Sequence, residues 1–347
     1  MLDSGNHRAP CRQFLAPLEA ALFVWPRSFL ALLGRYGPTA FGLSLLVGFA
    51  LPWLARPVKP ILGAIIFCFI AINMMRADLP ALRRLAQRPS LIATLLAWNT
   101  LLPFAVVGAI VAIFGRAAFE PGLLLGMAVT AAAPPLVAAP AYALLLGFSN
   151  AVPLTVLVLG MAITPLSAPL IADAIVGSAA PIDQIALTIR LAIFLFGAMA
   201  VGLAIRKAVG ETWLSKNKPE FDGAGVVLFF VFAIALTESV SQAAFADLGK
   251  VALYLGIAFA ICIICFVLTW LAWRRFHRRE AVTLAIATGL RNTGLIIAAM
   301  GVNTVPDATF LFFALMQFPV YFAPQLLKPF VGAMAGNIKA KEEIAAG

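Results

Sequence analysis

Long apolar runs alternate along this chain with short clusters of charged residues. A helix that crosses a membrane needs about 20 consecutive apolar residues, and ten runs approach or exceed that length. They predict spans over residues 37–54, 58–75, 89–113, 121–147, 150–176, 184–205, 223–242, 249–273, 281–303 and 308–334. The pattern therefore predicts an all-α membrane protein with ten transmembrane helices.

The composition supports this fold class. Of the 347 residues, 63% are hydrophobic and 12% are charged. Soluble domains are about 45–50% apolar and about 25% charged, so an ordinary soluble protein is excluded, and a disordered one would need far more charge. The four cysteines suggest no disulfide framework, and Cys262 and Cys265 lie in an apolar run without a nearby histidine or carboxylate. We expect no metal and no cofactor.

The net charge of +10 would suit a nucleic-acid-binding protein, but the positions of the basic residues do not. Lys and Arg lie in clusters between the apolar runs, where they set the orientation of a membrane protein. If the N-terminus is cytoplasmic, the following basic residues lie inside: Arg8, Arg12, Arg27, Arg35, Arg76, Arg83, Arg84, Arg88, Arg206, Lys207, Lys216, Lys218, Arg274, Arg275, Arg278, Arg279, Lys328, Lys339 and Lys341. Only four lie outside: Arg56, Lys59, Arg116 and Lys250. The bias predicts that both termini are cytoplasmic, with a cytosolic lead and interfacial helix over 1–36 and a cytosolic tail over 335–347.

Two of the apolar runs contain helix-breaking residues near their centres. The run AAAPPLVAAP contains Pro134, Pro135 and Pro140, and the run TGLRNTG contains Gly289, Arg291 and Gly294. Proline removes a helix hydrogen bond and clashes with the preceding turn. The breaks fall in the fourth span of each set of five, which predicts two five-helix repeats, 37–176 and 177–334, inserted in opposite directions. Paired interruptions of this kind indicate the binding site of a secondary transporter near the midplane.

Four segments resemble the bile acid:sodium symporter family, within the wider bile acid, arsenite and riboflavin transporter grouping: INMMRADLPALRRLAQRP, LLPFAV, GMAVTAAAPPLVAAP and LAIATGLRNTGLIIA. The resemblance covers residues 37–334. It implies a core unit of spans 3–5 and 8–10, whose broken helices cross, and a panel unit of spans 1, 2, 6 and 7. Substrate would bind between the two units, and one would move against the other to alternate access.

The chain departs from the family where the family binds sodium. Gly289 and Asn292 match the ninth-span motif, but the acidic residue of that motif is Ala287 here and its glutamine is Arg291. The family's other polar ligands fall on or beside apolar residues: Trp98, Ala139, Pro140, Pro153 and Leu157. Sodium is a hard cation that requires oxygen ligands, so the family's sodium sites do not carry over. The cysteine that arsenite exporters have at the fourth-span break is missing as well.

Arg291 is the main candidate functional residue, because a charge at mid-membrane is costly and marks function by default. Two roles are open. Its guanidinium could bond the carbonyl ends of the half-helices at the crossing and act as a fixed cation in place of sodium. It could instead face a cavity and hold an anionic substrate through paired hydrogen bonds.

Other polar residues at a suitable depth are candidate substrate ligands: Asn99, Thr100, Thr130, Tyr142, Thr288, Asn292, Thr293 and Gln317. Any of them could equally be a hydrogen-bond partner between helices. Glu238 and Arg190, at similar depths in spans seven and six, could form an ion pair or a proton site. Proton coupling and facilitated diffusion therefore both remain open.

The sequence predicts a secondary transporter or facilitator of small organic anions in a cell inner membrane, without bound sodium. One alternative is a sodium symporter that holds its ion with backbone carbonyls. Another is a membrane sensor or scaffold that transports nothing. An enzyme is not expected, because no span holds a histidine or a suitable carboxylate pair. The partners expected are the anion and the lipid bilayer, not nucleic acid; the oligomeric state is open, and a monomer is plausible.

Overall fold

The computed structural model describes residues 55–77, 80, 87–179, 182–275 and 278–346, and every regular element in these ranges is a helix. The predicted lead 1–36 and first span 37–54 lie outside the described residues. The elements are α3 (Ala55–Val58), η2 (Lys59–Ile61), α4 (Leu62–Met75), α6 (Pro89–Phe114), η3 (Arg116–Ala118), α7 (Pro121–Ala132), α8 (Ala139–Leu145), α9 (Ala151–Val176), η4 (Gly177–Ala179), α10 (Gln184–Val209), α11 (Glu211–Lys216), α12 (Lys218–Ala246), α13 (Leu248–Trp273), α14 (Arg278–Gly289), α15 (Thr293–Met300) and α16 (Asp307–Ala346).

Six of the described helices are long and apolar enough to cross a membrane: α6, α9 with η4, α10, α12, α13 and the part of α16 up to Pro329. Each includes at least 23 residues, which exceeds the length that a bilayer core requires. Large apolar side chains such as Ile185, Ile193 and Phe245 are exposed, as expected of surfaces that face lipid. Within the described residues the prediction of an all-helical fold is confirmed, and by length and composition these helices are those of a membrane-embedded protein.

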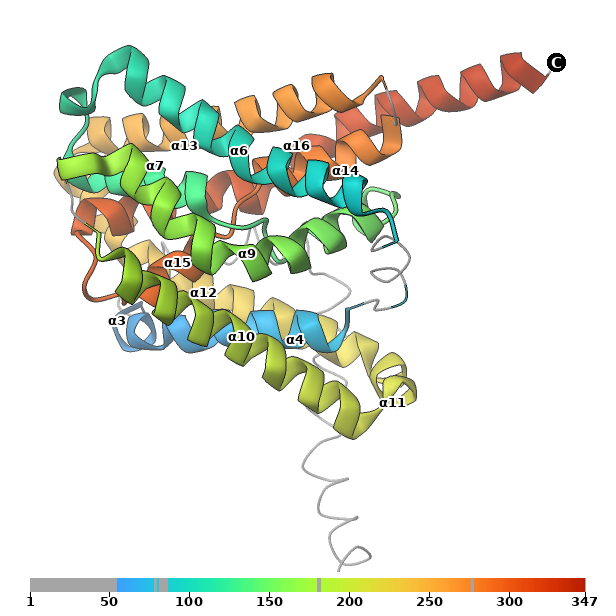
Figure 1. Ribbon diagram of the computed structural model, residues 1–347, viewed down its shortest axis with the longest axis horizontal. Coiled ribbons are helices and arrows are strands. Elements are labelled where there is room, and N and C mark those ends of the chain that lie inside the picture. The colour runs from blue at the N-terminus through green and yellow to red at the C-terminus, as the bar shows by residue number, and fades with distance from the viewer. Residues whose placement is uncertain (1–54, 78–79, 81–86, 180–181, 276–277, 347) are drawn as a thin grey trace, which may run out of the picture.

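The helices form two layers (Figure 1). One layer contains α4, α10 and α12, and the other contains α6, α9, α13, α14 and α16. α7 packs on α6, α9 and α16 and so belongs to the second layer, whereas α15 lies between the layers and contacts α4, α10 and α16. Edge-on aromatic contacts join the layers: Phe232 of α12 packs against Phe313 of α16, and Phe229 of α12 packs against Tyr321 of α16.

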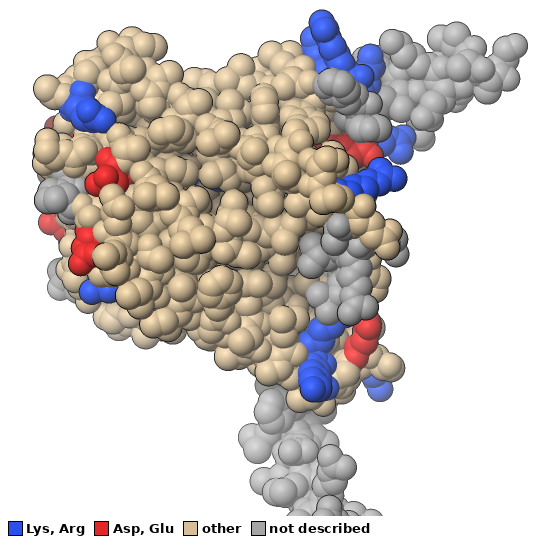
Figure 2. Space-filling model, in the orientation of Figure 1, with Lys and Arg blue, Asp and Glu red and all other residues tan. Residues whose placement is uncertain are grey.

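Basic residues gather at one end of the helices, which we call the arginine-rich end (Figure 2). Arg206 at the end of α10 donates to the carbonyls of Met75 and Ala77 at the end of α4 and just after it, and Arg76 pairs with Asp222 at the start of α12. Trp98 of α6 packs against Trp273, so the end of α13 lies here too. The described residues of this end include Arg76, Arg88, Arg206, Lys207, Lys216, Lys218, Arg274, Arg275, Arg278, Arg279 and Lys328.

At the opposite end acidic and basic residues are mixed, and the face between the ends is almost free of charge in Figure 2. Glu120 pairs with Lys250 there, and Arg116 of η3 bonds the carbonyls of Ala174 and Ile175 at the end of α9. The two ends thus differ in charge along the direction in which the apolar helices run.

From the second predicted span onward, the long described helices lie over the predicted ranges, and α3, η3 and α11 lie between them. Residues 335–346 of the predicted cytosolic tail are helical, as a continuation of α16. The sequence NIKAKEEIAA is rich in strong helix formers and contains no proline, so nothing in it ends the helix.

Candidate functional site

The first interruption separates α7 from α8, and two prolines cause it. Pro134 and Pro135 have no N–H, so the carbonyls of Thr130 and Ala131 lose the donors that an α-helix would supply. The residue before a proline is pushed out of the helical region, and Ala133 is extended, with φ −65° and ψ 148°. α7 therefore ends at Ala132, inside the protein.

The second interruption separates α14 from α15 and contains no proline. Leu290, Arg291 and Asn292 leave the helix, and their backbone bonds go to the first interruption instead. The N–H of Leu136 donates to the Leu290 carbonyl at 2.8 Å, and the N–H of Asn292 donates to the Pro134 carbonyl at 2.9 Å. Pro135 and Arg291 thus form an antiparallel bridge. The two interruptions cross and satisfy each other's backbone groups, as unwound chain inside a membrane requires.

Arg291 lies at this crossing and is only 3% exposed. Its Nη1 donates to the side-chain oxygen of Asn99 at 2.7 Å and to the backbone carbonyl of Asn99 at 3.0 Å, and its Nη2 donates to the carbonyl of Ala133. The Ala133 carbonyl ends α7, where the helix dipole is negative. A single guanidinium therefore ties α14–α15 to both α6 and α7.

The carbonyl of Asn99 is free to accept this bond because of another proline. In an α-helix it would accept from the residue four positions later, which is Pro103 and has no N–H. Arg291 thus bonds one carbonyl of α6 that has lost its helical donor and the carbonyl of Ala133 just past the end of α7. Within the described residues its Nε has no hydrogen-bond partner, and no salt bridge joins it to an Asp or Glu.

Other predicted ligands extend this polar cluster. Asn99 donates through Nδ2 to the hydroxyl of Thr288 at 3.1 Å, and Thr288 in turn donates to the Leu284 carbonyl. On the other side of the interruption, Gln317 of α16 donates to the hydroxyl of Thr293 at 3.3 Å. The structure therefore brings Arg291, Asn99 and Thr288 together, and pairs Thr293 with Gln317.

The remaining predicted ligands have separate contacts. Thr130 donates to the Gly126 carbonyl within α7, and the Tyr142 hydroxyl donates to the Val320 carbonyl, which joins α8 to α16. Asn292 takes part through its backbone. Thr100 follows Asn99 on α6 and is half-buried, and its side chain points about 100° away around the helix.

Three predicted break residues lie within helices. Pro140 is in the first turn of α8, where its missing N–H costs no helical bond. Gly289 ends α14, and a Cβ there would lie 3.0 Å from the Cys262 carbonyl of α13. Gly294 is in the first turn of α15, and a Cβ there would press on Ile66 and Phe313 at 3.1–3.3 Å. The glycines serve close helix packing, while the unwound residues are Ala133–Ala138 and Leu290–Asn292.

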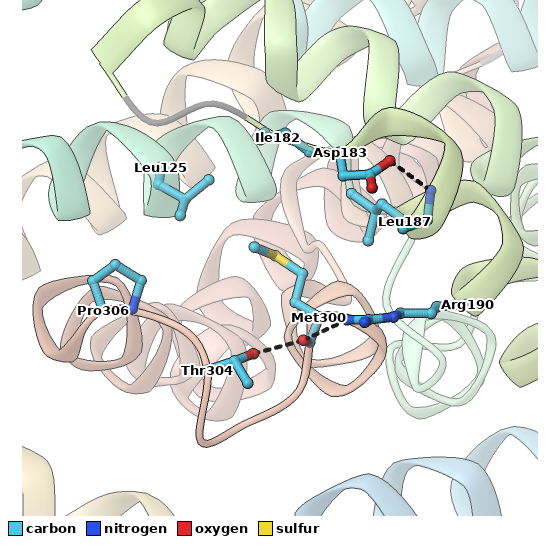
Figure 3. A pocket seen from close by; sticks show the side chains of 9 residues that line it. Leu125, Ile182, Asp183, Leu187, Arg190, Met300, Thr304 and Pro306 are labelled. Carbon is cyan, nitrogen blue, oxygen red and sulfur yellow. Dashed lines mark hydrogen bonds between the residues drawn. The ribbon is translucent and has the colours of Figure 1, made fainter.

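Arg190 does not lie at the crossing. It projects from α10 into a cavity of about 420 Å³ near the opposite end, where its Nη1 donates to the Met300 carbonyl at 3.3 Å (Figure 3). Glu238 lies on α12, but its side chain is outside the described residues, so the predicted ion pair or proton site stays a prediction. Cys262 and Cys265 are buried and unpaired beside the crossing, as small core residues.

In comparison with known proteins, no protein-family model and no curated protein matches the chain.

Sequence reasoning missed two residues that build the Arg291 site, Pro103 and Ala133. A signal for the first was present, because a proline four positions after a mid-membrane asparagine exposes that asparagine's carbonyl. The place of Ala133 follows from the proline that comes after it. What no pattern in the sequence shows is that both carbonyls point at the same guanidinium.

Proposed function

We propose that the protein is a secondary transporter or facilitator of small organic anions that works by alternating access and without bound sodium. Under this proposal the chain is a divergent relative of the bile acid:sodium symporters, with ten spans in two inverted repeats. The α4–α10–α12 layer corresponds to the panel and the remaining helices to the core. The protein lies in a cell inner membrane with both termini and the arginine-rich end in the cytoplasm.

The observation that supports this proposal best is the crossing of two interrupted helices around Arg291. Interrupted helices that meet in the protein interior are characteristic of transporters, because their free helix ends form ion and substrate sites. A structural protein or scaffold would gain nothing from a buried cation that costs several kcal/mol to hold in a membrane.

Arg291 favours the fixed-cation role over the ligand role. Three of its hydrogen bonds go to Asn99 and Ala133, and the guanidinium is buried. A sodium ion at this crossing would need the same carbonyl oxygens, since it binds through oxygen ligands. A positive charge that is already bonded to them leaves a second cation repelled and short of ligands, which disfavours the sodium-symporter alternative.

Transport by the purified full chain in proteoliposomes tests the proposal. The probes are labelled benzoate, succinate and taurocholate, each offered once in sodium chloride and once in choline chloride. We expect saturable flux of at least one anion, equal in the two salts. Flux that falls more than tenfold in choline would support the sodium symporter, and flux no higher than in protein-free vesicles for all three anions would contradict transport.

Arg291→Gln in the same vesicles tests the role of the cation. We expect flux to fall at least tenfold in both salts, because the carbonyls of Asn99 and Ala133 lose their donor. Arg116→Gln is the matched control, since Arg116 also bonds carbonyls at a helix end but lies far from the crossing. Monodispersity on size exclusion shows that each variant is folded, and wild-type flux in folded Arg291→Gln would contradict the role of the residue.

A further inference from the structure

The cavity near the opposite end lies between the two layers. α10 supplies one wall, and α7 and the end of α15 supply the other (Figure 3). Its volume of about 420 Å³ is within the range of small-molecule sites. The lining is mainly apolar, with Leu125, Leu187 and Met300 among it, and its charged side chains are Arg190 and Asp183.

Asp183 is occupied in capping α10. Its Oδ1 accepts from the N–H of Ala186 at 2.9 Å, where the positive end of the helix dipole offsets its charge. It precedes Arg190 by seven residues, which is about 10 Å along the helix. The two charges are therefore at separate places in the cavity, and the end near Arg190 is positive.

Arg190 is exposed and held by a long bond. Its Nη1 lies 3.3 Å from the Met300 carbonyl, which also accepts a 2.7 Å bond from the hydroxyl of Thr304. A guanidinium has five N–H donors in a planar fork that fits a carboxylate or sulfonate with two parallel bonds. The single hydroxyl hydrogen of Thr304 also lies within reach of the Gly301 carbonyl at 2.8 Å. A charged anion would be a stronger acceptor for Arg190 than this neutral carbonyl of Met300, to which its bond is long.

The bond from Arg190 also joins the two layers, because Arg190 belongs to α10 and Met300 ends α15. Gly301 follows with φ +99°, a conformation that glycine adopts readily, and ends α15 at Met300, whose carbonyl contacts Arg190 of α10. Any acceptor that replaces the Met300 carbonyl as the partner of Arg190 therefore removes a hydrogen bond between α10 and the interrupted helix.

We propose that this cavity binds one small organic anion with an apolar body, and that the anion replaces the Met300 carbonyl as the hydrogen-bond acceptor of Arg190. Occupancy then loosens the two layers at this end, which couples binding to movement of α10 against α15. The inference rests on the proposed transport function and assigns its substrate contact to Arg190, leaving Arg291 as the fixed cation. The same chemistry, an anion on an apolar body, also describes an anionic lipid.

Equilibrium binding to the purified chain tests the charge requirement. The probes are benzoate and its uncharged analogue benzamide, titrated in a thermal-shift assay. We expect benzoate but not benzamide to raise Tm, and Arg190→Gln to weaken benzoate binding at least tenfold. Arg116→Gln, at the same end but not part of the cavity lining, keeps wild-type affinity. Equal benzoate affinity in Arg190→Gln and wild type would overturn the inference.

Thiol protection gives a second measurement that does not depend on the stability of Arg190→Gln. Ala186→Cys is introduced at the cavity lining and Ala118→Cys outside it on η3, with Cys11 and Cys68 replaced by serine. We expect benzoate to slow maleimide labelling at position 186 at least threefold and not at position 118. Unchanged labelling at 186 would overturn the inference.

Nanodiscs separate a dissolved anion from a lipid. Protection of Ala186→Cys by benzoate in phosphatidylcholine nanodiscs supports the dissolved anion, and protection by added phosphatidylglycerol without benzoate would assign the cavity to a lipid headgroup and overturn it. If proteoliposomes carry anions while Arg190→Gln binds them normally, this inference alone fails. If no anion is carried or bound, the proposed function fails as well.

Discussion

Arg291 has the function that a helical N–H has elsewhere. Pro103 leaves the Asn99 carbonyl without a donor, Pro134 ends α7 so that the Ala133 carbonyl is free, and one guanidinium bonds both. Unsatisfied carbonyls cost several kcal/mol each in a membrane, so the arginine and the prolines compensate for each other. The Asn99 amide completes the arrangement, because it accepts from Arg291 and donates to Thr288.

Substitution of Asn99 tests this arrangement. Asn99→Leu removes a hydrogen bond to a charged group and should cost about 2–3 kcal/mol, seen as a lower Tm of the purified chain. Asn99→Asp keeps the acceptor and places a carboxylate beside an otherwise unpaired charge, so its Tm should be no lower than that of the wild type. If the Arg291 guanidinium has only neutral acceptors, a carboxylate at position 99 should stabilise it. A Tm of Asn99→Asp as low as that of Asn99→Leu would contradict this view.

A pH dependence arises at the opposite end, where Glu120 precedes α7. The Lys250 ammonium, 2.7 Å away, and the Tyr254 hydroxyl bond its carboxylate and lower its pKa below the ordinary value. A lowered pKa means that the pair stabilises the protein fully above about pH 4.5, and that this contribution is lost as the pH falls through the lowered pKa.

Glu120→Gln should therefore lower the Tm at pH 7, and the difference from wild type should shrink below about pH 4. The carboxylate is 48% exposed, so solvent screening limits the effect to about 1 kcal/mol or less. Lys250→Met added to Glu120→Gln should cost little more, because the pair is already broken. A Tm difference that does not change with pH would show that Glu120 acts through packing instead of charge.

At the scale of the element, the interruptions result from two different causes. α7 ends because adjacent prolines make a helix impossible, and that end is readable in the sequence. α14 ends without a proline, because its free backbone groups find partners in the first interruption. The motif TGLRNTG indicated a break but not its cause, since Gly289 and Gly294 turned out to be packing positions inside helices.

Close packing of α10 on α4 depends on Gly202. A Cβ at this position would overlap the Ala71 carbonyl oxygen and approach the Met74 Cβ to 3.0 Å, and a helix backbone cannot move aside as a side chain can. Gly202→Ala should cost about 1–3 kcal/mol through overpacking. Gly256→Ala on α13 is the control, because nothing lies within 4 Å of its Cβ, and its Tm should be unchanged or higher. Equal thermal stability of the two variants would contradict the packing argument.

At the scale of the whole molecule, the two ends predict an orientation. The end rich in arginine should face the cytoplasm, because basic loops are retained there. Thr212→Cys on α11 and Ser178→Cys on η4 are both exposed and lie at opposite ends. A membrane-impermeant maleimide added to intact cells should label position 178 and not 212. The reverse pattern would show that the protein is inserted the other way.

Most of the helical fold was predictable, because the length and hydropathy of each run fix a spanning helix without reference to its neighbours. The contacts of Arg291 were only partly predictable: Pro134 shows where a carbonyl is exposed, but which side chain meets it depends on how α6 crosses α14. The cavity at Arg190 was not predictable, since its other wall ends at Met300, far along the chain. From the sequence, Arg190 was predicted only as a partner of Glu238, because the two charges lie at similar depths in their spans.

The burial of Arg291 has an energetic consequence for the proposed transporter. A cation that is part of the polypeptide returns with the protein after every cycle, so no sodium gradient is drawn down. In the facilitated-diffusion case the anion then crosses with its own charge uncompensated. At a resting potential of about 100 mV, negative inside, each negative charge then gains about 2.3 kcal/mol on leaving the cell. At equilibrium the cytoplasmic concentration of a monovalent anion would be roughly a fiftieth of the outside concentration. Such a protein would serve for export of its substrate, not for uptake.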